Sequence, residues 1–253
     1  MNLPTLSKYH GAGNDFILIE DFEKTFSHTL IKQLCDRRLG VGADGLILAQ
    51  PSSIADYEMV YFNADGSRAG MCGNGLRCFV HFLQDQGYVK PLYKIEVAGK
   101  VLTVKCQGSK ILTLLPLPKV LEWGVELLSR TVYVVDVGVP HVVVFANGRV
   151  NVLQEGGEMR HHEKLQPEGA NVNFVWKVHK SCIRIRTYER GVENETLACG
   201  TGAAAVAFVA FRLGECKNEM EVVTRSGEIL EVCIGKEIAI TGPSVKVFDA
   251  HFF

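Results

Sequence analysis

Apolar and polar residues alternate in short segments along most of the chain, and two longer apolar runs interrupt this pattern. The segment Ser181–Tyr188, in which isoleucines alternate with arginines, is typical of a half-buried strand. The two longer runs begin at Leu76 and Ala203 and are expected to be helices. Short strands with one long apolar helix in each half of the chain predict an α+β protein, in which a curled sheet wraps around a central helix.

Further strands are expected over residues 16–19, 46–49, 57–62, 94–97, 101–104, 111–114, 133–137 and 141–145, with a turn at 63–67. A helix is expected over 29–38, where Leu30, Leu34 and Cys35 share an apolar face. The prolines in Leu115–Pro118 interrupt regular strand pairing, so a domain boundary is expected there.

A four-residue motif occurs twice, as Cys72-Gly73-Asn74-Gly75 and as Cys199-Gly200-Thr201-Gly202, and the separation, 199 − 72, is 127 residues. Each copy opens one of the apolar runs, and each run ends on a glycine 15 residues after its cysteine (87 − 72 and 214 − 199). A strand, a glycine turn and a second strand follow in both halves, around Gly99 and Gly227. This internal duplication predicts two pseudo-symmetric domains of mixed sheet, residues 1–118 and 119–244.

The repeat would place a thiol, Cys72 or Cys199, at the start of a helix in each domain. A helix N-terminus has unpaired N–H groups and a partial positive charge, which favour a thiolate over a thiol and can bind an anion. Two such helix ends facing each other would hold one carboxylate between two thiols, an arrangement suited to moving a proton across a carbon. The remaining cysteines are interpreted as small buried hydrophobic residues; they are Cys35, Cys78, Cys106, Cys182, Cys216 and Cys233.

Composition and charge exclude several classes of function. The formal net charge of −1 gives no electrostatic reason to expect a nucleic-acid partner or an anionic membrane surface. The first residues lack the pattern of a secretory signal, and the longest apolar run, 203–211, is too short to span a bilayer. Eight cysteines without an export signal indicate a reducing compartment and a cytoplasmic location.

No cofactor is expected from the motifs. The segment Gly40–Gly45 matches G-x-G-x-x-G by letter, but a helix is expected before it and a strand after it, the reverse of a dinucleotide site. The pair His161-His162 lies in a polar segment without the cysteine or carboxylate spacing of a zinc site. We therefore expect no nucleotide, metal or pyridoxal phosphate.

At five blocks spread along the chain, the sequence resembles the diaminopimelate epimerases. These blocks are His10–Phe16, Phe62–Ser67, Met71–Phe79, Pro167–Phe174, and Glu189–Gly191 continuing to Leu197–Gly202. The resemblance implies a cofactor-independent epimerase that interconverts L,L- and meso-diaminopimelate in the synthesis of lysine and peptidoglycan precursors. It also implies an active site in the cleft between the two domains and a final strand, 245–253, that returns to the first domain.

The resemblance implies roles for individual residues. The acid and base would be the thiols of Cys72 and Cys199, with Glu189 and His141 close to them and assisting their proton state. Backbone N–H groups at Gly73, Asn74, Gly200 and Thr201 would bind the α-carboxylate, and Asn14 would help to hold this reacting end. Asn63, Asn171 and Arg190 would hold the distal amino-acid group. A small amino acid is thus the expected partner, and a homodimer is a possible assembly.

Three positions depart from the family pattern. A block that is usually Gly-Asn-Pro-His reads Gly138–His141, so Val139 replaces a polar residue. Gly45 occupies a position that is glutamine in some members, and the loop 191–196 is one residue longer than usual. These departures concern the distal end of the substrate and predict a relaxed substrate selectivity.

Two other functions stay open on the sequence alone. A two-thiol racemase of another amino acid, such as glutamate, would use the same thiols; proline fits less well, because Arg190 and Asn171 provide a second carboxylate site. A non-catalytic relative or a thiol-redox protein is the third reading, although no C-x-x-C motif is present.

Overall fold

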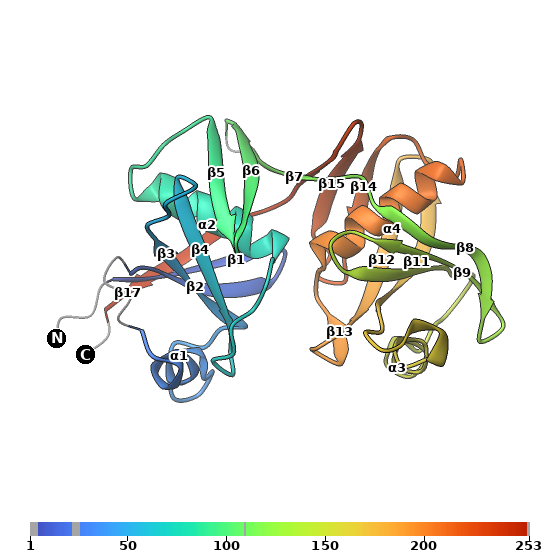
Figure 1. Cartoon of the computed structure of the whole chain (residues 1–253), viewed down its shortest axis with the longest axis horizontal. Coiled ribbons are helices and arrows are strands. Elements are labelled where there is room, and N and C mark those ends of the chain that lie inside the picture. The colour runs from blue at the N-terminus through green and yellow to red at the C-terminus, as the bar shows by residue number, and fades with distance from the viewer. Residues whose placement is uncertain (1–4, 22–25, 109, 252–253) are drawn as a thin grey trace. The chain divides into compact units, whose positions relative to one another are not determined.

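The computed structural model describes residues 5–21, 26–108 and 110–251. Contacts divide the chain into two compact units, Met1–Leu114 with Gly242–Phe253 and Leu115–Thr241 (Figure 1). Each unit combines a mixed β-sheet with helices, so the chain is an α+β protein with a two-fold repeat.

The first unit is a mixed sheet in the order β17-β1-β2-β3-β4-β5-β6-β7, with two helices. Its strands are β1 (Leu6–Gly11), β2 (Asn14–Glu20), β3 (Gly45–Gln50), β4 (Tyr57–Asn63), β5 (Leu92–Val97), β6 (Lys100–Gln107), β7 (Lys110–Leu115) and β17 (Val245–Ala250). Its helices are α1 (His28–Cys35) and α2 (Gly73–Asp85).

The second unit is a mixed sheet in the order β8-β9-β10-β11-β12-β14-β15-β16, with the short β13 paired to β12. Its strands are β8 (Lys119–Leu127), β9 (Arg130–Asp136), β10 (Pro140–Phe145), β11 (Asn171–His179), β12 (Cys182–Glu189), β13 (Asn194–Thr196), β14 (Glu219–Val223), β15 (Ile229–Ile234) and β16 (Ile238–Thr241). Its helices are α3 (Val152–Arg160), the short 3-10 helix η1 (Glu163–Leu165) and α4 (Gly200–Arg212).

The two sheets repeat the same pattern of strand directions. Read along each order, successive pairs are antiparallel, antiparallel, parallel, antiparallel, parallel, antiparallel and antiparallel. The helices occupy matching places as well. In each unit, α1 or α3 connects the two strands of the first parallel pair. Helix α2 or α4 lies in the connection of the second parallel pair, directly before its later strand, β5 or β14. The duplication predicted from the motif, helix and hairpin therefore extends over the whole topology of each unit.

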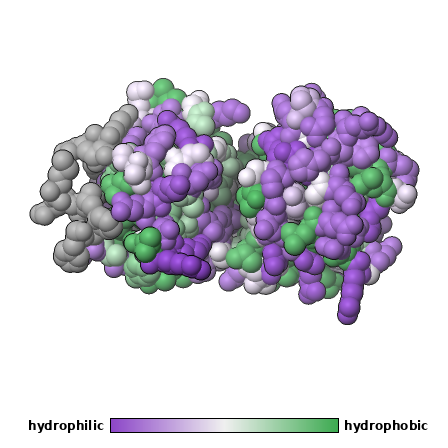
Figure 2. All heavy atoms as spheres, turned by 90° about the horizontal axis from the view of Figure 1, so that it is seen from below, coloured by the Kyte–Doolittle hydropathy of each residue, from purple (hydrophilic) through white to green (hydrophobic). Residues whose placement is uncertain are grey.

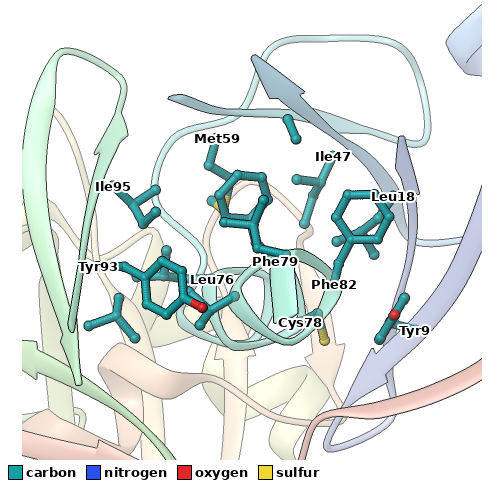
Figure 3. Packing of buried hydrophobic residues seen from close by; sticks show 14 of the residues in the cluster. Tyr9, Leu18, Ile47, Met59, Leu76, Cys78, Phe79, Phe82, Tyr93 and Ile95 are labelled. Carbon is teal, nitrogen blue, oxygen red and sulfur yellow. The ribbon is translucent and has the colours of Figure 1, made fainter. Parts of the chain in front are cut away.

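Strands β2 and β3 of the first unit carry buried apolar residues on both faces, because a helix covers each face. In β2, Phe16 and Leu18 pack in the cluster around α2, whereas Ile17 and Ile19 pack in the cluster around α1. Phe79 of α2 is fully buried and lies among side chains from several strands (Figure 3). Burying a side chain of this size stabilises the fold by roughly 1.5–3 kcal/mol, so this cluster holds α2 against the sheet.

Helices α2 and α4 are both 13 residues long and are followed by glycines, Gly87 and Gly214, with φ of 90° and 72°. This left-handed conformation is the common way to end a helix and favours glycine. Helix α4 is buried on nearly all sides, which explains why its sequence is apolar throughout rather than along one stripe. Both helices begin and end where the duplicated sequence predicts.

One expectation about local structure is wrong. The helix expected over 29–38 ends at Cys35, because the side chain of Asp36 accepts hydrogen bonds from the backbone N–H groups of Arg38 and Leu39 and forms a turn. The polar segment before His161, for which no element was expected, is the helix α3, although it contains Gly156 and Gly157; His161 and His162 follow the end of this helix.

The loop expected over 191–196 is also partly a strand, since β13 covers its second half. Hydrophilic residues predominate on the face shown in Figure 2, with hydrophobic residues scattered among them. Among the described residues, no helix is long and apolar enough to cross a membrane.

Candidate active site

Cys72 is the N-cap residue of α2. Its backbone is extended, with φ −128° and ψ 114°, and its sulfur accepts a hydrogen bond from the N–H of Gly75 at 3.4 Å. The first helical hydrogen bond runs from the N–H of Leu76 to the carbonyl of Cys72 at 2.8 Å. The thiol is thus held at the positive end of the helix, where a thiolate is favoured.

Cys199 is the N-cap residue of α4 in the same way. Its φ is −129° and its ψ is 112°, and its sulfur accepts from the N–H of Gly202 at 3.3 Å. The hydroxyl of Thr201 lies 3.5 Å from this sulfur, and Cys199 is only 8% exposed, whereas Cys72 is half-buried. Each unit therefore presents one thiol at a helix start, as the repeated motif predicts.

Side chains around Cys72 form a connected polar group in the first unit. The sulfur of Cys72 lies 3.6 Å from Oδ1 of Asn14, and Nδ2 of Asn74 lies 3.5 Å from the same oxygen. Nδ2 of Asn14 donates to the carboxylate of Asp44 at 2.8 Å. The guanidinium of Arg77 donates to Oδ1 of Asn74 at 2.6 Å. Asn14 and Asn74, both predicted as site residues, are thus brought next to the thiol.

Arg77 is fully buried in α2. Besides Asn74, it donates to the carbonyl of Gly73 at 3.2 Å, and its Nε has no hydrogen-bond partner among the described residues. Burial lowers its pKa, and the nearby thiols of Cys78 and Cys72 act in the opposite direction. A buried cation that braces the first turn of the helix was missing from the predicted site, although a charge inside an apolar helix run is a visible signal in the sequence.

The helix start of the second unit packs against a buried amide, Asn173 of β11. A Cβ atom at Gly202 would lie 2.5 Å from Oδ1 of Asn173, so only glycine fits there. This amide is fixed on both sides: its oxygen accepts from the hydroxyl of Thr187 at 3.0 Å, and its Nδ2 donates to the carbonyl of Val142 at 3.0 Å. Asn173 was also missed, since nothing in the sequence separates it from the other asparagine of its block, Asn171.

His141 is completely buried in β10, and its Nδ1 lies 3.1 Å from Nδ2 of Asn173. Because that amide nitrogen can only donate, Nδ1 is the acceptor and the proton of the neutral ring sits on Nε2. Nε2 is buried without a partner among the described residues. Burial, and then the positive charge of Arg190, lower the pKa of His141 to about 3, so the imidazole is neutral near pH 7.

The predicted residues for the distal group divide between the units. In the second unit, Oδ1 of Asn171 accepts from the backbone N–H of Arg190 at 2.9 Å, so these two residues are neighbours. The guanidinium of Arg190 lies 3.9 Å from the carboxylate of Glu168 and is partly exposed. Asn63, in the first unit, is exposed and donates to the hydroxyl of Ser67 at 3.0 Å. Glu189, half-buried, ends β12 next to Arg190.

The other cysteines differ from the two helix-start thiols. Burial raises the pKa of Cys78 to about 12 and that of Cys35 to about 11, so these thiols stay protonated. The interpretation as buried hydrophobic residues is wrong for Cys233, which is exposed, and only partly holds for Cys106, which is half-buried. No group of three or more His, Cys, Asp or Glu side chains that could hold a metal is found within the described part of the chain.

Two of the three departures from the family pattern have a local explanation. At Gly45, a Cβ atom would lie 2.4 Å from the carbonyl oxygen of Phe62, so a side chain has no room there. The extra length before Cys199 includes a turn that continues into β13. Val139 is half-buried in the turn between β9 and β10, where its carbonyl accepts from the N–H of Val137 at 3.1 Å.

A model of the diaminopimelate epimerase family matches residues 6–113 and 133–247. A diaminopimelate epimerase of Chlorobaculum tepidum is 40% identical over 94% of this chain and 97% of its own length. Those of Archaeoglobus fulgidus and Aquifex aeolicus are 38% and 40% identical, each over 96% of this chain and over 94% and 96% of their own lengths.

The solved structures that resemble this chain in fold include proteins with names other than diaminopimelate epimerase. A phenazine biosynthesis protein of the PhzF family from Bacillus anthracis has a TM-score of 0.75 at 16% identity, with both chains covered completely. A probable proline racemase from Agrobacterium radiobacter has a TM-score of 0.73 at 16% identity, over 99% of this chain and 93% of that one. At these identities the likeness concerns the fold alone.

Proposed function

The chain belongs to the diaminopimelate epimerase family, and on this basis we propose that it interconverts L,L- and meso-diaminopimelate by proton transfer between two thiols. The observation that carries this proposal is the pair of N-cap thiols, Cys72 and Cys199, held in one conformation at the starts of two duplicated helices. The fold by itself would not select this substrate, since similar folds occur in proteins of different names.

The chemistry follows from inverting one carbon. A thiolate removes the α proton, so that a C–H bond breaks and an S–H bond forms. The thiol on the opposite face then gives its proton to the carbanion, and the two thiols end with their protonation states exchanged. An ordinary thiol is only a few per cent thiolate at pH 7, and a helix N-terminus raises this fraction by lowering the pKa. One unit supplies Cys72 and the other Cys199.

The first turns of α2 and α4 would stabilise the carbanion. Negative charge spreads into the α-carboxylate as the proton leaves, and preorganised N–H groups of the kind found at a helix start stabilise such charge. We assign this role to Gly73 and Asn74 in α2 and to Gly200 and Thr201 in α4. Asn14 beside Cys72 would receive the α-amino group at the fixed oxygen of its amide.

The distal amino-acid group would be held by Asn63, Asn171 and Arg190. Arg190 suits the distal carboxylate because its planar guanidinium binds carboxylates through two hydrogen bonds. His141 is neutral and buried, so its part would be to fix Asn173 and, with Glu189, to shape the surroundings of a thiol rather than to carry the proton itself.

We further expect the reaction to need no pyridoxal phosphate or metal. The product would serve the synthesis of lysine and of peptidoglycan precursors in the cytoplasm. Because the formal charge is −1, a nucleic-acid or anionic membrane partner is not expected. A homodimer stays a prediction.

The test is solvent exchange at the reacting carbon. The enzyme is incubated with L,L-diaminopimelate in D₂O, and NMR follows the loss of the α-proton signal and the appearance of the meso isomer. Cys72→Ala and Cys199→Ala should each lower this rate by at least about 100-fold, the lower end of what general acid–base catalysis contributes, and circular dichroism should show an intact fold. Normal turnover by either variant would exclude the two-thiol mechanism.

One alternative activity, racemisation of glutamate, can be separated in the same assay. L-Glutamate is incubated under the same conditions and analysed by chiral chromatography. Exchange of glutamate faster than of diaminopimelate would favour the racemase, and exchange of diaminopimelate alone would exclude it.

A further inference from the structure

A chain of side chains leads from Asp44 to Arg77 past the thiol of Cys72. Asp44 precedes β3 and accepts from Nδ2 of Asn14 at 2.8 Å. Oδ1 of Asn14 lies 3.5 Å from Nδ2 of Asn74 and 3.6 Å from the sulfur of Cys72. At the far end, Arg77 donates to Oδ1 of Asn74 at 2.6 Å.

The two ends of this chain set the direction of every hydrogen bond in it. A carboxylate can only accept and a guanidinium can only donate. The carboxylate of Asp44 therefore accepts from the NH₂ group of Asn14, and the guanidinium of Arg77 donates to the oxygen of Asn74. The NH₂ group of Asn74 is left facing Asn14. The carbonyl oxygen of Asn14 is turned toward Cys72, and its NH₂ group is turned away.

An acceptor next to sulfur favours the thiol, because S–H can donate to it and a thiolate cannot. The contact of Asn14 with Asp44 controls this orientation, since a 2.8 Å bond to a carboxylate is stronger than the 3.5 Å contact between Asn14 and Asn74. Asp44 is itself held, because the guanidinium of Arg37 donates to its other oxygen at 2.8 Å.

Other charged and titratable groups also face Cys72. On its own helix, Arg77 and the N–H of Gly75 favour the thiolate, whereas Cys78 is buried and protonated. From β1, Gly11 lies against Asn74 at the start of α2 and carries no charge. The amide of Asn14 from β2 is the group whose orientation can change the balance.

The surroundings of Cys199 differ. Its sulfur accepts from the N–H of Gly202 at 3.3 Å and lies 3.5 Å from the hydroxyl of Thr201, which can turn its proton toward a thiolate. The position that corresponds to Arg77, at 77 + 127, is Ala204. The duplicated helices therefore carry thiols with unequal neighbours.

We infer that Asp44 is a positioning residue that holds the Asn14 amide as an acceptor toward Cys72, so that Cys72 carries the proton in the resting enzyme and Cys199 is the thiolate. This inference deepens the proposed function and rests on it. Its test uses the free enzyme and no substrate, so it can fail while the epimerase activity stands, and the reverse is also possible.

The experiment measures how fast each thiol is alkylated by iodoacetamide between pH 5 and 10, with mass mapping of the peptides that contain Cys72 and Cys199. In the unmodified enzyme, the midpoint pH of alkylation should be higher for Cys72. The Asp44 oxygen that accepts from Asn14 also accepts from the backbone N–H of Asp15 at 3.2 Å, and the other oxygen accepts from the charged guanidinium of Arg37. In Asp44→Asn, we expect the new amide to keep its oxygen toward Arg37, the charged donor, and to place its NH₂ group toward Asn14, which makes the Asn14 amide rotate. Alkylation of Cys72 at pH 7 should then become roughly 10-fold faster or more, the effect of exchanging one hydrogen bond to a charged group, and Cys199 should be unchanged.

Two further variants separate amide orientation from charge. Arg37→Met disturbs the same ion pairs but leaves Asp44 bound to Asn14, so the alkylation of Cys72 should not become faster. Asn14→Ala removes the acceptor without changing Asp44, and should accelerate Cys72 by itself, which keeps the test valid if Asp44→Asn folds poorly. Adding Asp44→Asn to Asn14→Ala should then have no further effect.

Three results would overturn the inference. One is a midpoint pH of alkylation for Cys72 that is equal to or lower than that for Cys199 in the unmodified enzyme; the midpoint is compared because Cys199 is the less exposed thiol. Another is an alkylation rate of Cys72 that is unchanged in both Asp44→Asn and Asn14→Ala. The third is an acceleration by Asp44→Asn that persists at full size in the Asn14→Ala background, since the carboxylate would then act by its charge and not through the amide.

Discussion

Cys72 and Cys199 share one backbone conformation, with φ of −128° and −129° and ψ of 114° and 112°. In each, the sulfur accepts from the N–H group three residues later, at 3.4 and 3.3 Å. The sequence repeat is therefore reproduced in the local structure, and a chemical difference between the thiols must come from neighbouring side chains. Some belong to the helices, such as Arg77 in α2 and Thr201 in α4, and others pack against the helix starts. Those residues are an amide fixed by Asp44 in one unit and the amide of Asn173 in the other.

The glycines at the third helical position, Gly75 and Gly202, should respond differently to the same substitution. A Cβ atom at Gly202 would meet Oδ1 of Asn173 at 2.5 Å, and Asn173 is fixed by hydrogen bonds on both sides. At Gly75 the nearest atom is the tip of Ile47 at 3.0 Å, which can move. Gly202→Ala should destabilise the protein by roughly 1–3 kcal/mol through overpacking and lower kcat, and Gly75→Ala should cost less.

Urea unfolding gives the stabilities, and the exchange assay gives kcat. The control is Gly70→Ala, because a Cβ atom at Gly70 would meet nothing within 4 Å, and it should stay within about 0.5 kcal/mol of the parent. Equal effects at Gly75 and Gly202 would show that Asn173 does not restrain the start of α4.

The helix starts could be predicted because neighbouring residues in the sequence determine them. A cysteine followed by glycines and a long apolar run defines an N-cap and a buried helix, and Gly87 and Gly214 define the ends. Helix α3 was not predicted, because it contains two glycines and glycine disfavours helix interiors. Gly156 is required there because a Cβ atom would lie 2.6 Å from the side chain of Tyr188, a contact between distant segments that no local pattern contains.

Asp44, Arg77 and Asn173 escaped prediction for a related reason. Their roles depend on which face of a strand or helix they occupy after the sheet has formed. Asp44 stands in a segment that was rejected as a dinucleotide motif because a helix was expected before it and a strand after it, and α1 and β3 lie in these places. Rejecting the motif removed the reason to consider its aspartate, which the fold brings within 2.8 Å of Asn14.

His141 should make the protein less stable in mild acid. Its pKa is about 3 in the folded state because of burial and the charge of Arg190, against about 6.5 in an unfolded chain. Between these values the unfolded state binds the extra proton, so stability falls as the pH falls, by about 1.4 kcal/mol per pH unit from this group. His141→Gln, which can still accept from Asn173, should flatten this slope.

The measurement is the free energy of unfolding in urea at several pH values from 4 to 7. The matched control is His161→Gln, at an exposed imidazole, which should retain the slope of the parent. A slope in His141→Gln as steep as in the parent would mean that the buried imidazole does not resist protonation.

Asp15 should support the fold at neutral pH and lose that role in strong acid. Its carboxylate lies 2.8 Å from the ammonium of the buried Lys8, which also donates to the carbonyl of Gly42, and 2.6 Å from the guanidinium of Arg37. Burial raises the pKa of Asp15, but the hydrogen bonds from Arg37 and Lys8 outweigh it and hold the pKa below its usual value. The stability it provides is complete above about pH 4, the pKa of an unfolded aspartate, and is lost as the pH falls toward its folded pKa.

Asp15→Asn should therefore lower the free energy of unfolding at pH 7 by roughly 1.5–3 kcal/mol, the usual value of a hydrogen bond to a charged group. The difference from the parent should shrink below pH 4. Glu237→Gln, at an exposed carboxylate, serves as the control for loss of one negative charge. A loss at pH 7 no larger than in the control would place Asp15 among the surface ion pairs that contribute little.

Val139 should control how strictly the distal end of the substrate is selected. It is half-buried two residues before His141 and replaces a polar residue of the family pattern. Losing one hydrogen bond to a buried charged group costs about 1.5–3 kcal/mol, which corresponds to roughly 10- to 150-fold in discrimination. The distal group would be affected, because the helix starts that bind the α-carboxylate in the proposed mechanism are unchanged. We therefore expect slow racemisation of glutamate, at a rate below that of diaminopimelate.

Val139→Asn should restore the contact and raise the ratio of kcat/KM for diaminopimelate over glutamate by about 10-fold or more. Gly45 offers no comparable test, since a Cβ atom there would lie 2.4 Å from the carbonyl of Phe62. The control is Val178→Asn, at an exposed position of β11, and the Cys72→Ala variant gives the blank for chiral chromatography. If D-glutamate never rises above that blank and Val139→Asn leaves the kinetics of diaminopimelate unchanged, the valine has a structural role only and the enzyme is as selective as the rest of its family.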